Sequence, residues 1–229
     1  MKRINKFKGL NLWCMLFLTL GSCETEVTDF GFDGNISGML KEASGKIVPG
    51  DLSSNNLVVN VLAEGDKLNL IIRVNGDGIF KNSKLTPVNH KIWISGPVFP
   101  IDTIYTDLAS GAKSFNQELV VVPFLSIETP VVIGTPTSSS VEVKFNIVGN
   151  EGKQAARREV YCSTVKFPTT STGSGVGYHT VKKTLISNNG IASITGLTAG
   201  TKYYLRLGAQ ATGTTYWNYS EQIIINTSE

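Results

Sequence analysis

Short runs of β-branched and aromatic residues recur along the chain from residue 30 onward, separated by Gly, Asn, Asp and Pro. Several runs alternate apolar and polar positions, as a strand with one buried face does, and no long stretch has the period of an amphipathic helix. The pattern therefore predicts an all-β protein. The strands that we expect span residues 34–40, 57–62, 68–74, 91–95, 114–122, 141–148, 159–165, 191–194, 202–210 and 222–226.

The spacing of these strands favours two consecutive β-sandwiches of about 100 residues each over one large sandwich. The strand pattern breaks between Pro123 and Pro130, so we expect the joint there, with one sandwich at 31–124 and the other at 125–229. Residues 24–124 hold 8 basic and 12 acidic side chains, whereas residues 125–229 hold 9 and 6. Opposite charge balances permit weak docking between the two halves but specify no ligand.

The first 22 residues have the layout of a cleaved export signal. Four basic residues lie in the first eight positions, and an apolar stretch of eleven residues follows at 10–20. That stretch is too short for a membrane-spanning helix, which needs about 20 apolar residues. Small residues at 21 and 22 then precede Cys23, and this sequence resembles a bacterial lipobox.

The lipobox resemblance implies that Cys23 is lipidated and becomes the N-terminus, with residues 23–30 as a tether. An ordinary secretory signal followed by an unmodified cysteine is the alternative. Acyl chains on one cysteine anchor a protein firmly, since each buried methylene contributes about 0.8 kcal/mol. The acidic residues Glu24, Glu26 and Asp29 resemble the signal for surface export in Bacteroidota lipoproteins, although a solvated tether is often acidic as well. The expected location is the outer membrane, lipid-anchored at the cell surface.

The basic isoelectric point of 8.7 comes from the export signal. Four of the 21 basic residues lie in it, so the remaining 17 face 18 acidic residues. A nearly neutral mature chain offers no electrostatic footprint for nucleic acid, and we expect no nucleic-acid partner.

The cysteines and histidines predict neither a disulfide nor a metal site. Cys14 leaves with the signal and Cys23 is taken by lipid, so Cys162 remains without a partner cysteine. His90 and His179 lie in different predicted sandwiches, and no Cys or carboxylate stands at a zinc-like spacing from either. We therefore expect no cofactor, and stability that comes from packed cores.

The second half resembles a fibronectin type III domain. The residues at 197–203 (LTAGTKY) are similar to the corner that precedes the sixth strand of that fold. There Gly200 permits a tight corner, and the Tyr203 hydroxyl is expected to hydrogen-bond the preceding backbone. Phe145 stands where the family usually has a core tryptophan, and Tyr219 resembles a core position at the start of the last strand.

The first half resembles the carboxypeptidase-regulatory-like, transthyretin-type sandwich. The similar features are residues 36–38 at the start of a strand, the hairpin at 75–80 that enters a strand, and Leu-Thr-Pro at 85–87. Where that family usually has glycine and tyrosine, this chain has Val88 and His90.

Taken with the stretches at 80–103 and 122–125, the mature chain resembles a family of uncharacterised Bacteroidota surface lipoproteins. In that family, a carboxypeptidase-regulatory-like module precedes a fibronectin-like one, and the genes lie in glycan-uptake loci. The resemblance implies fold and location more directly than activity, because its motifs are mainly structural.

Three sequence features could carry chemistry, and each also has a structural interpretation. The Asn-Gly-Asp-Gly sequence at 75–78 could bind calcium, but it has too few carboxylates and equally suits a tight hairpin turn. Ser174 and His179 could form a nucleophile and base, but Ser174 lies in a Ser/Thr/Gly-rich stretch typical of a loop. Paired carboxylates of a glycosidase would need a deep cleft, which small sandwiches seldom provide.

Aromatic residues are the candidates for glycan binding, because apolar sugar faces stack on Trp and Tyr while neighbouring amides bond the hydroxyls. Tyr216, Trp217 and Asn218 cluster before the last predicted strand. Trp93 lies between Ile92 and Ile94, so it points out of the core if the strand alternates. Packing at the end of a sandwich, or between the two sandwiches, is the alternative for both tryptophans.

One short sequence suggests a covalent modification. Asp102, Thr103 and Ile104 resemble the O-glycosylation signal of Bacteroidota, in which an acid precedes a hydroxyl residue and an aliphatic one. The resemblance implies that Thr103 is the acceptor.

The sequence thus favours a non-catalytic binding or accessory subunit of an outer-membrane glycan-acquisition system. Its expected partners are the outer membrane, a glycan, and an outer-membrane transporter or that transporter's surface lipoprotein. A structural or protein-interaction spacer is the alternative, and a small hydrolase is a third, weaker hypothesis.

Overall fold

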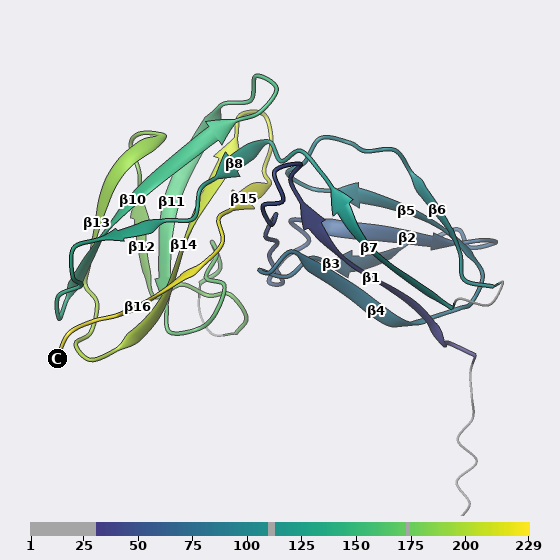
Figure 1. Cartoon of the computed structure of the whole chain (residues 1–229), viewed down its shortest axis with the longest axis horizontal. Coiled ribbons are helices and arrows are strands. Elements are labelled where there is room, and N and C mark those ends of the chain that lie inside the picture. The colour runs from purple at the N-terminus through teal and green to yellow at the C-terminus, as the bar shows by residue number, and fades with distance from the viewer. Residues whose placement is uncertain (1–30, 110–112, 173–174) are drawn as a thin grey trace, which may run out of the picture. The chain divides into compact units, whose positions relative to one another are not determined.

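The computed structural model describes residues 31–109, 113–172 and 175–229. This part of the chain contains sixteen strands and no helix (Figure 1). It therefore holds no helix that could cross a membrane. Residues Gly31–Glu229 form one compact unit with two large hydrophobic clusters, one within 36–121 and one within 125–225, and a small aromatic cluster of Tyr161, Trp217 and Tyr219. The prediction of an all-β protein built from sandwiches is confirmed.

The first sandwich consists of two sheets around the cluster that contains Ile36, Phe80 and Ile92. One sheet has the order β4-β1-β7, and its β1 and β7 are parallel. The other sheet is antiparallel, with the order β3-β2-β5-β6. The strands are β1 (Gly34–Lys41), β2 (Val58–Ala63), β3 (Leu70–Arg73), β4 (Ile79–Leu85), β5 (Asn89–Ser95), β6 (Ile104–Asp107) and β7 (Ser114–Val120).

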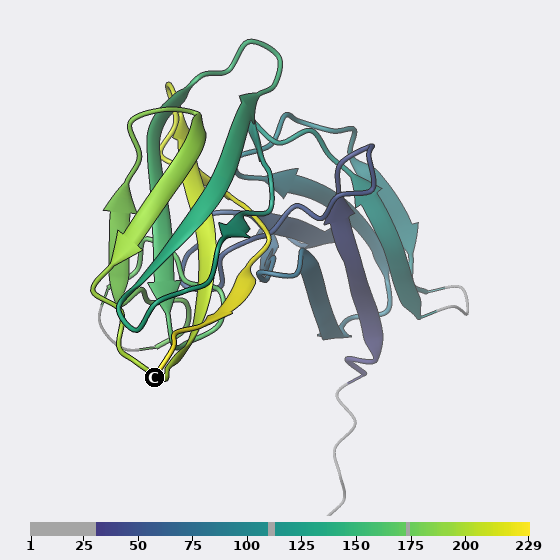
Figure 2. The ribbon, with the colours of Figure 1, turned by 60° about the vertical axis from the view of Figure 1, so that its left-hand side comes forward.

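The second sandwich also consists of two sheets (Figures 1 and 2). They enclose the cluster that contains Val143, Phe145 and Leu205. One sheet has the order β13-β10-β8, with β9 also paired to β10. The other has the order β12-β11-β14-β15, with β16 also paired to β14. The strands are β8 (Leu125–Ile127), β9 (Val131–Ile133), β10 (Ser140–Gly149), β11 (Ala155–Ser163), β12 (Val181–Thr184), β13 (Asn189–Thr195), β14 (Lys202–Ala211), β15 (Trp217–Tyr219) and β16 (Ile223–Asn226).

Every strand that the hydrophobic pattern predicted is present, with ends shifted by a few residues. The pattern missed the seven-residue β4, which only the resemblance to the transthyretin-type sandwich indicated, and it missed β6, β8, β9, β12 and β15, each of which has three or four residues. Such a short segment shows one or two alternations at most, so its pairing partners define it rather than its own sequence. The strand expected after the hairpin at 75–80 is β4.

The corner predicted from the fibronectin resemblance is confirmed. The backbone N–H of Thr198 donates a hydrogen bond to the Tyr203 hydroxyl at 3.0 Å. Gly200 has a φ of +59°, which a residue with a Cβ adopts only with strain. Phe145 is buried in the core of this sandwich.

The Asn-Gly-Asp-Gly sequence forms a turn that its own asparagine organises. The side-chain oxygen of Asn75 accepts hydrogen bonds from the backbone N–H groups of Asp77 at 2.9 Å and Ile79 at 2.8 Å. Gly76 fits beneath the ring of Phe167, where an added Cβ would lie 2.1 Å from a ring carbon. The turn is therefore also a contact between the two sandwiches.

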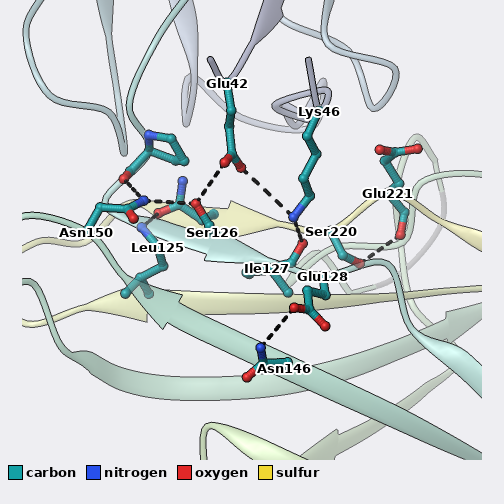
Figure 3. Close-up of polar contacts among 12 residues, drawn as sticks. Glu42, Lys46, Leu125, Ser126, Ile127, Glu128, Asn146, Asn150, Ser220 and Glu221 are labelled. Atoms are coloured by element: carbon teal, nitrogen blue, oxygen red, sulfur yellow. Dashed lines mark hydrogen bonds and ion pairs between the residues drawn. The ribbon is translucent and has the colours of Figure 1, made fainter. Parts of the chain in front are cut away.

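Further polar contacts join the loop after β1 to strand β8 (Figure 3). The Lys46 ammonium donates to the Ile127 carbonyl at 2.6 Å, and the Ser126 hydroxyl donates to the Glu42 carboxylate at 3.1 Å. The Asn150 side chain donates to Ser126 Oγ at 2.9 Å and thereby holds the second sandwich's part of this network. Side chains that bond to one another and to a backbone carbonyl therefore hold the chain at this junction.

Candidate functional site

The aromatic cluster predicted near residue 217 lies at the junction between the two sandwiches. Trp217 and Asn218 belong to β15 and are only 7% and 3% exposed. Tyr216, which precedes the strand, is 40% exposed. Of these three predicted binding residues, only Tyr216 presents a large part of its side chain to solvent.

Trp217 and Asn218 are held by four hydrogen bonds, three of which cross the junction. The Asn56 side chain donates to the Trp217 carbonyl at 2.6 Å and accepts from the Trp217 N–H at 2.7 Å. The Asn218 side chain donates to the Pro97 carbonyl at 2.9 Å and accepts from the Leu125 N–H at 3.1 Å. The side chains of Asn56 and Asn218 thus bond to backbone groups as an adjacent strand would. The buried backbone N–H and carbonyl groups here therefore have hydrogen-bond partners.

The rings of this cluster are covered by other side chains. The Arg157 guanidinium lies over the Trp217 ring, 5.2 Å from its centroid, and Tyr161 meets the same ring edge to face. The Arg206 guanidinium lies over the Tyr219 ring at 4.0 Å. A sugar that stacked on Trp217 or Tyr219 would have to displace one of these groups, so the cluster is arranged as a packed minicore.

Arg206 is the most unusual member of the junction, because it is a fully buried cation. Its Nε donates to the Pro168 carbonyl at 2.6 Å, and both terminal nitrogens lie 3.3 Å from the Gly50 carbonyl. Burial lowers the pKa of Arg206, while Tyr219, Asp51 and Tyr161 act in the opposite direction. The guanidinium fork thus links β14 to a loop of the first sandwich.

The minicore borders a pocket of about 330 Å³ that includes Asp51, Asn55 and Tyr216 in its lining. The Asp51 carboxylate is itself engaged, since it accepts from the Ser53 N–H at 2.8 Å and from the Ser54 hydroxyl at 3.1 Å. The pocket has polar walls but one exposed aromatic ring, so it offers little surface for stacking.

Trp93 lies in a different environment, on the outward face of the sheet β3-β2-β5-β6. Ile92 and Ile94 enter the first core, and Trp93 points to the opposite face, where it is partly exposed. Across the sheet, Trp93 is opposite Asn60, and Lys91 is opposite Tyr105. The outward orientation predicted for Trp93 is therefore confirmed.

Tyr105 extends this surface as a second aromatic residue. It is 71% exposed and lies diagonally across from Trp93 on the neighbouring strand, a separation that aromatic side chains can bridge. The Lys91 ammonium lies 6.0 Å from the Tyr105 ring centroid. We call this surface the Trp93 face; from their register, its residues are Asn60, Leu62, Ile71, Lys91, Trp93 and Tyr105.

Side-chain amides hold fixed positions beside the tryptophan. The Asn60 side chain donates to the Ser95 hydroxyl at 2.9 Å and accepts from the Asn69 side chain at 2.8 Å. Asn60 itself is buried, so the polar groups that the Trp93 face offers beside its two aromatic rings are the Ser95 hydroxyl and the exposed Asn69 amide that Asn60 holds in place. Apolar rings beside oriented hydrogen-bonding groups are what a sugar requires, since a pyranose has both an apolar face and a rim of hydroxyls.

A pocket of about 570 Å³ continues from the Trp93 face around the end of the sheet. We call it the His90 pocket. Its lining includes Tyr105 and Lys91 from the Trp93 face and His90, which alternation places on the core side of β5. The remaining lining residues are Leu62, Ala63, Glu64, Gly65, Asp66, Asn89, Thr106 and Asp107.

His90 is a buried polar residue with an incomplete set of partners. It is 3% exposed, and its Nδ1 has no hydrogen-bond partner among the described residues. Burial lowers the pKa of His90, and the Val88 carbonyl and the Asp66 carboxylate oppose this effect. The imidazole is therefore held mainly neutral, with one nitrogen able to donate and the other to accept.

The other predicted sites are less informative in the structure. Thr103 is exposed in the segment between β5 and β6. Cys23 and Ser174 lie outside the described residues, and the His179 ring shares a 2.8 Å hydrogen bond with the Thr169 carbonyl. Across residues 31–109, 113–172 and 175–229, no three His, Cys, Asp or Glu side chains group as a metal site would.

Sequence reasoning identified Trp93 but not the surface that surrounds it. The sequence alone indicated neither Tyr105 nor the amides of Asn60 and Asn69 as neighbours of Trp93. The alternation of residues 57–62 could have indicated Asn60, since it is polar between Val59 and Val61. Nothing local links it to Trp93, because strand pairing brings them together across 33 residues.

The fold places the chain among all-β sandwich proteins, and solved structures share its arrangement. No protein-family profile matches the sequence, and no curated protein matches it. A candidate carbohydrate-binding protein from Bacteroides uniformis aligns with a TM-score of 0.68 at 19% identity, over 86% of this chain and 100% of that chain.

Two proteins of the DUF3823 family are similarly close. The one from Parabacteroides merdae aligns with a TM-score of 0.66 at 15% identity, over 85% of this chain and 98% of that one. The one from Bacteroides ovatus has a TM-score of 0.65 at 16% identity, with the same shares covered. At these identities, the likeness shows a shared fold across nearly the whole of each chain.

Proposed function

We propose that this protein is a non-catalytic carbohydrate-binding lipoprotein, which holds glycan on the Trp93 face for an outer-membrane acquisition system. The observation that carries the proposal is the position of Trp93 diagonally across from the exposed Tyr105, on a sheet face where the buried Asn60 holds the Ser95 hydroxyl and the exposed Asn69 amide. The similar structure from Bacteroides uniformis is described as a candidate carbohydrate-binding protein, which supports this class of ligand.

The membrane part of the proposal depends on the N-terminal sequence. Lipid on Cys23 would retain the protein at the outer membrane, where a transporter or its surface lipoprotein is the expected partner. A Cys23→Ser variant should be released from the membrane fraction, and the wild-type N-terminal peptide should carry the mass of its acyl chains. Protease accessibility on whole cells tests surface exposure. An N-terminal peptide without acyl chains would remove the anchor from the proposal.

Glycan binding is tested with a panel of neutral and charged polysaccharides in affinity gels, followed by calorimetry. Trp93→Ala and Tyr105→Ala should each weaken binding at least about tenfold, because truncation of a central aromatic contact typically loses more than 1 kcal/mol. Tyr216→Ala is the matched control, since it removes an exposed tyrosine of the second sandwich. Binding that survives both Trp93→Ala and Tyr105→Ala would contradict the proposed surface.

The second candidate is a spacer that positions a protein partner. The observation that favours it is the minicore of Trp217, Tyr219 and Arg206, which uses aromatic and charged groups to join the sandwiches. A spacer would bind no glycan of the panel and would still associate with its transporter after Trp93→Ala. The two functions therefore differ in their response to a single substitution.

Thr103 is proposed as the O-glycosylation acceptor, since it is exposed and follows an acidic residue. The tryptic peptide 92–113 isolated from the native organism should carry an added glycan mass. Thr103→Ala should remove that mass, and an unmodified wild-type peptide would contradict the assignment.

A further inference from the structure

The His90 pocket differs from the Trp93 face in its charge. Its lining contains the carboxylates of Glu64, Asp66 and Asp107 and a single ammonium, that of Lys91. Since the buried imidazole is held mainly neutral, negative charge predominates by about two. A hollow of one sign concentrates ligands of the opposite sign and repels those of the same sign.

The polar groups that line the pocket are held in fixed positions. The Glu64 carboxylate accepts from the Asn89 side chain at 2.8 Å, and the Asp107 carboxylate accepts from the Ala109 N–H at 2.7 Å. These bonds fix two of the three carboxylates. The lining also includes the buried His90, whose Nδ1 lacks a partner among the described residues. Buried polar groups are normally hydrogen-bonded, so this imidazole is a group that a ligand could complete.

Tyr105 connects the pocket to the Trp93 face. Its exposed ring belongs to both surfaces, together with Lys91 and Leu62. A glycan that lay along the Trp93 face would therefore present its end to the pocket. The volume of about 570 Å³ exceeds what one pyranose ring needs, and it falls in the range typical of small-molecule sites.

We propose that the His90 pocket binds the terminal ring of an amino-sugar glycan, with the ring's ammonium group facing Glu64 and Asp66. The proposal rests on the proposed function, since it names the sugar that the same surface prefers. Hydroxyl groups of the ring would reach the imidazole of His90 and the side chain of Asn89. An acidic sugar would meet two carboxylates at the same position and would be excluded.

The test uses the chain from Glu24 onward, which includes the whole compact unit Gly31–Glu229. Its amide resonances are titrated by NMR with glucosamine, N-acetylglucosamine, glucose and glucuronate at pH 6.5 and constant ionic strength. All four probes share a pyranose ring, but glucosamine is positively charged, glucuronate is negatively charged and the other two are neutral. Glucosamine should shift the resonances of Asn89, Lys91 and Tyr105. It should also bind roughly fivefold more tightly than glucose, because a solvent-exposed ion pair contributes up to about 1 kcal/mol. Glucuronate should leave them unchanged.

Asp66→Asn and Glu64→Gln should each reduce the preference for glucosamine over glucose while leaving the amide spectrum folded. Asp102→Asn is the matched control, because it removes an exposed acid outside the pocket and should leave the preference intact. Absence of glucosamine-induced shifts in the pocket, or an equal response to glucuronate, would overturn the inference.

Failure of this inference can be distinguished from failure of the proposed function. If glucosamine shifts no resonance of the pocket but Trp93→Ala still abolishes polysaccharide binding, the inference is wrong and the proposed function is supported. A pocket that responds to glucosamine, in a protein that binds no polysaccharide, supports the site and contradicts the function of the Trp93 face.

Discussion

At the scale of single residues, buried polar side chains determine how this molecule is held together. Asn56, Asn218 and Arg206 all bond to backbone groups rather than to one another. Removal of such a side chain leaves a buried carbonyl or N–H without a partner, which costs about 1–3 kcal/mol per group. Tyr203 and His90 illustrate two further consequences of burial, one for stability and one for its dependence on pH.

Tyr203→Phe tests the hydrogen bond that closes the corner after β13. The substitution keeps the buried ring but removes the acceptor of the Thr198 N–H, so we expect a loss of about 1 kcal/mol in the free energy of unfolding. Urea denaturation measures it. Tyr204→Phe is the control and should change stability by less than about 0.5 kcal/mol, because its ring is only half-buried. Equal losses of unfolding free energy in the two variants would show that the corner hydrogen bond does not stabilise the protein.

His90 should make stability depend on pH. Burial lowers its pKa in the folded state below the ordinary value of about 6.5, so the unfolded chain binds a proton more readily. Its contribution is therefore complete above pH 6.5 and is lost as the pH falls from there through the folded-state pKa. Denaturation of the wild type between pH 7.5 and 5.5 should show this loss, and His90→Gln should reduce the slope. An unchanged slope would indicate that other groups cause it.

At the scale of elements, the alternation of side chains along a strand leaves one tryptophan partly exposed on β5 and another buried on β15. On β5 it leaves Trp93 on an open sheet face, because no layer covers that position completely. On β15 all three residues are buried, because the first sandwich and β11 cover the strand from outside. A tryptophan's neighbours across space, and not its own strand, therefore decide whether it is available to a ligand.

Trp93→Ala and Trp217→Ala should separate these two roles. Truncation of the buried Trp217 removes contacts with Tyr161 and Arg157, and we expect a loss of about 3–5 kcal/mol in stability. Trp93→Ala should cost about 1 kcal/mol, because the ring is already partly in water. Thermal and urea denaturation of both variants measure the difference, and a larger loss for Trp93→Ala would mean that its face is covered.

At the scale of the whole molecule, two hydrophobic cores are joined by a polar junction. Apolar packing there includes the edge-to-face pair of Phe99 and Phe124 and the rings of Trp217 and Tyr219. Hydrogen bonds, the fit of Gly76 beneath Phe167 and the bonds of the Arg206 guanidinium to the Gly50 carbonyl add to it. Since the junction satisfies buried groups from both sandwiches, we expect the two cores to unfold together.

Asn56→Ala tests whether the junction couples the cores. It leaves the Trp217 N–H and carbonyl without their partners, so one calorimetric transition should become two. Asn146→Ala is the control, because it removes an exposed bond to Glu128 within the second sandwich and should preserve a single transition. One transition in the Asn56→Ala protein would show that other contacts are sufficient to couple the cores.

The sequence by itself determined the class of fold, the longer strands and the Tyr203 corner, because each depends on residues close together in the chain. Alternation also fixed the outward direction of Trp93, since successive side chains of a strand point to opposite faces. It did not reveal that Trp217 and Asn218 are buried, which depends on Asn56 and Pro97 far away in the chain. Only the tertiary structure decided this, because the short β15 is covered by groups from the other sandwich. The same physical reason applies to the Trp93 face and the His90 pocket, which exist only where β2, β5 and β6 are paired in register.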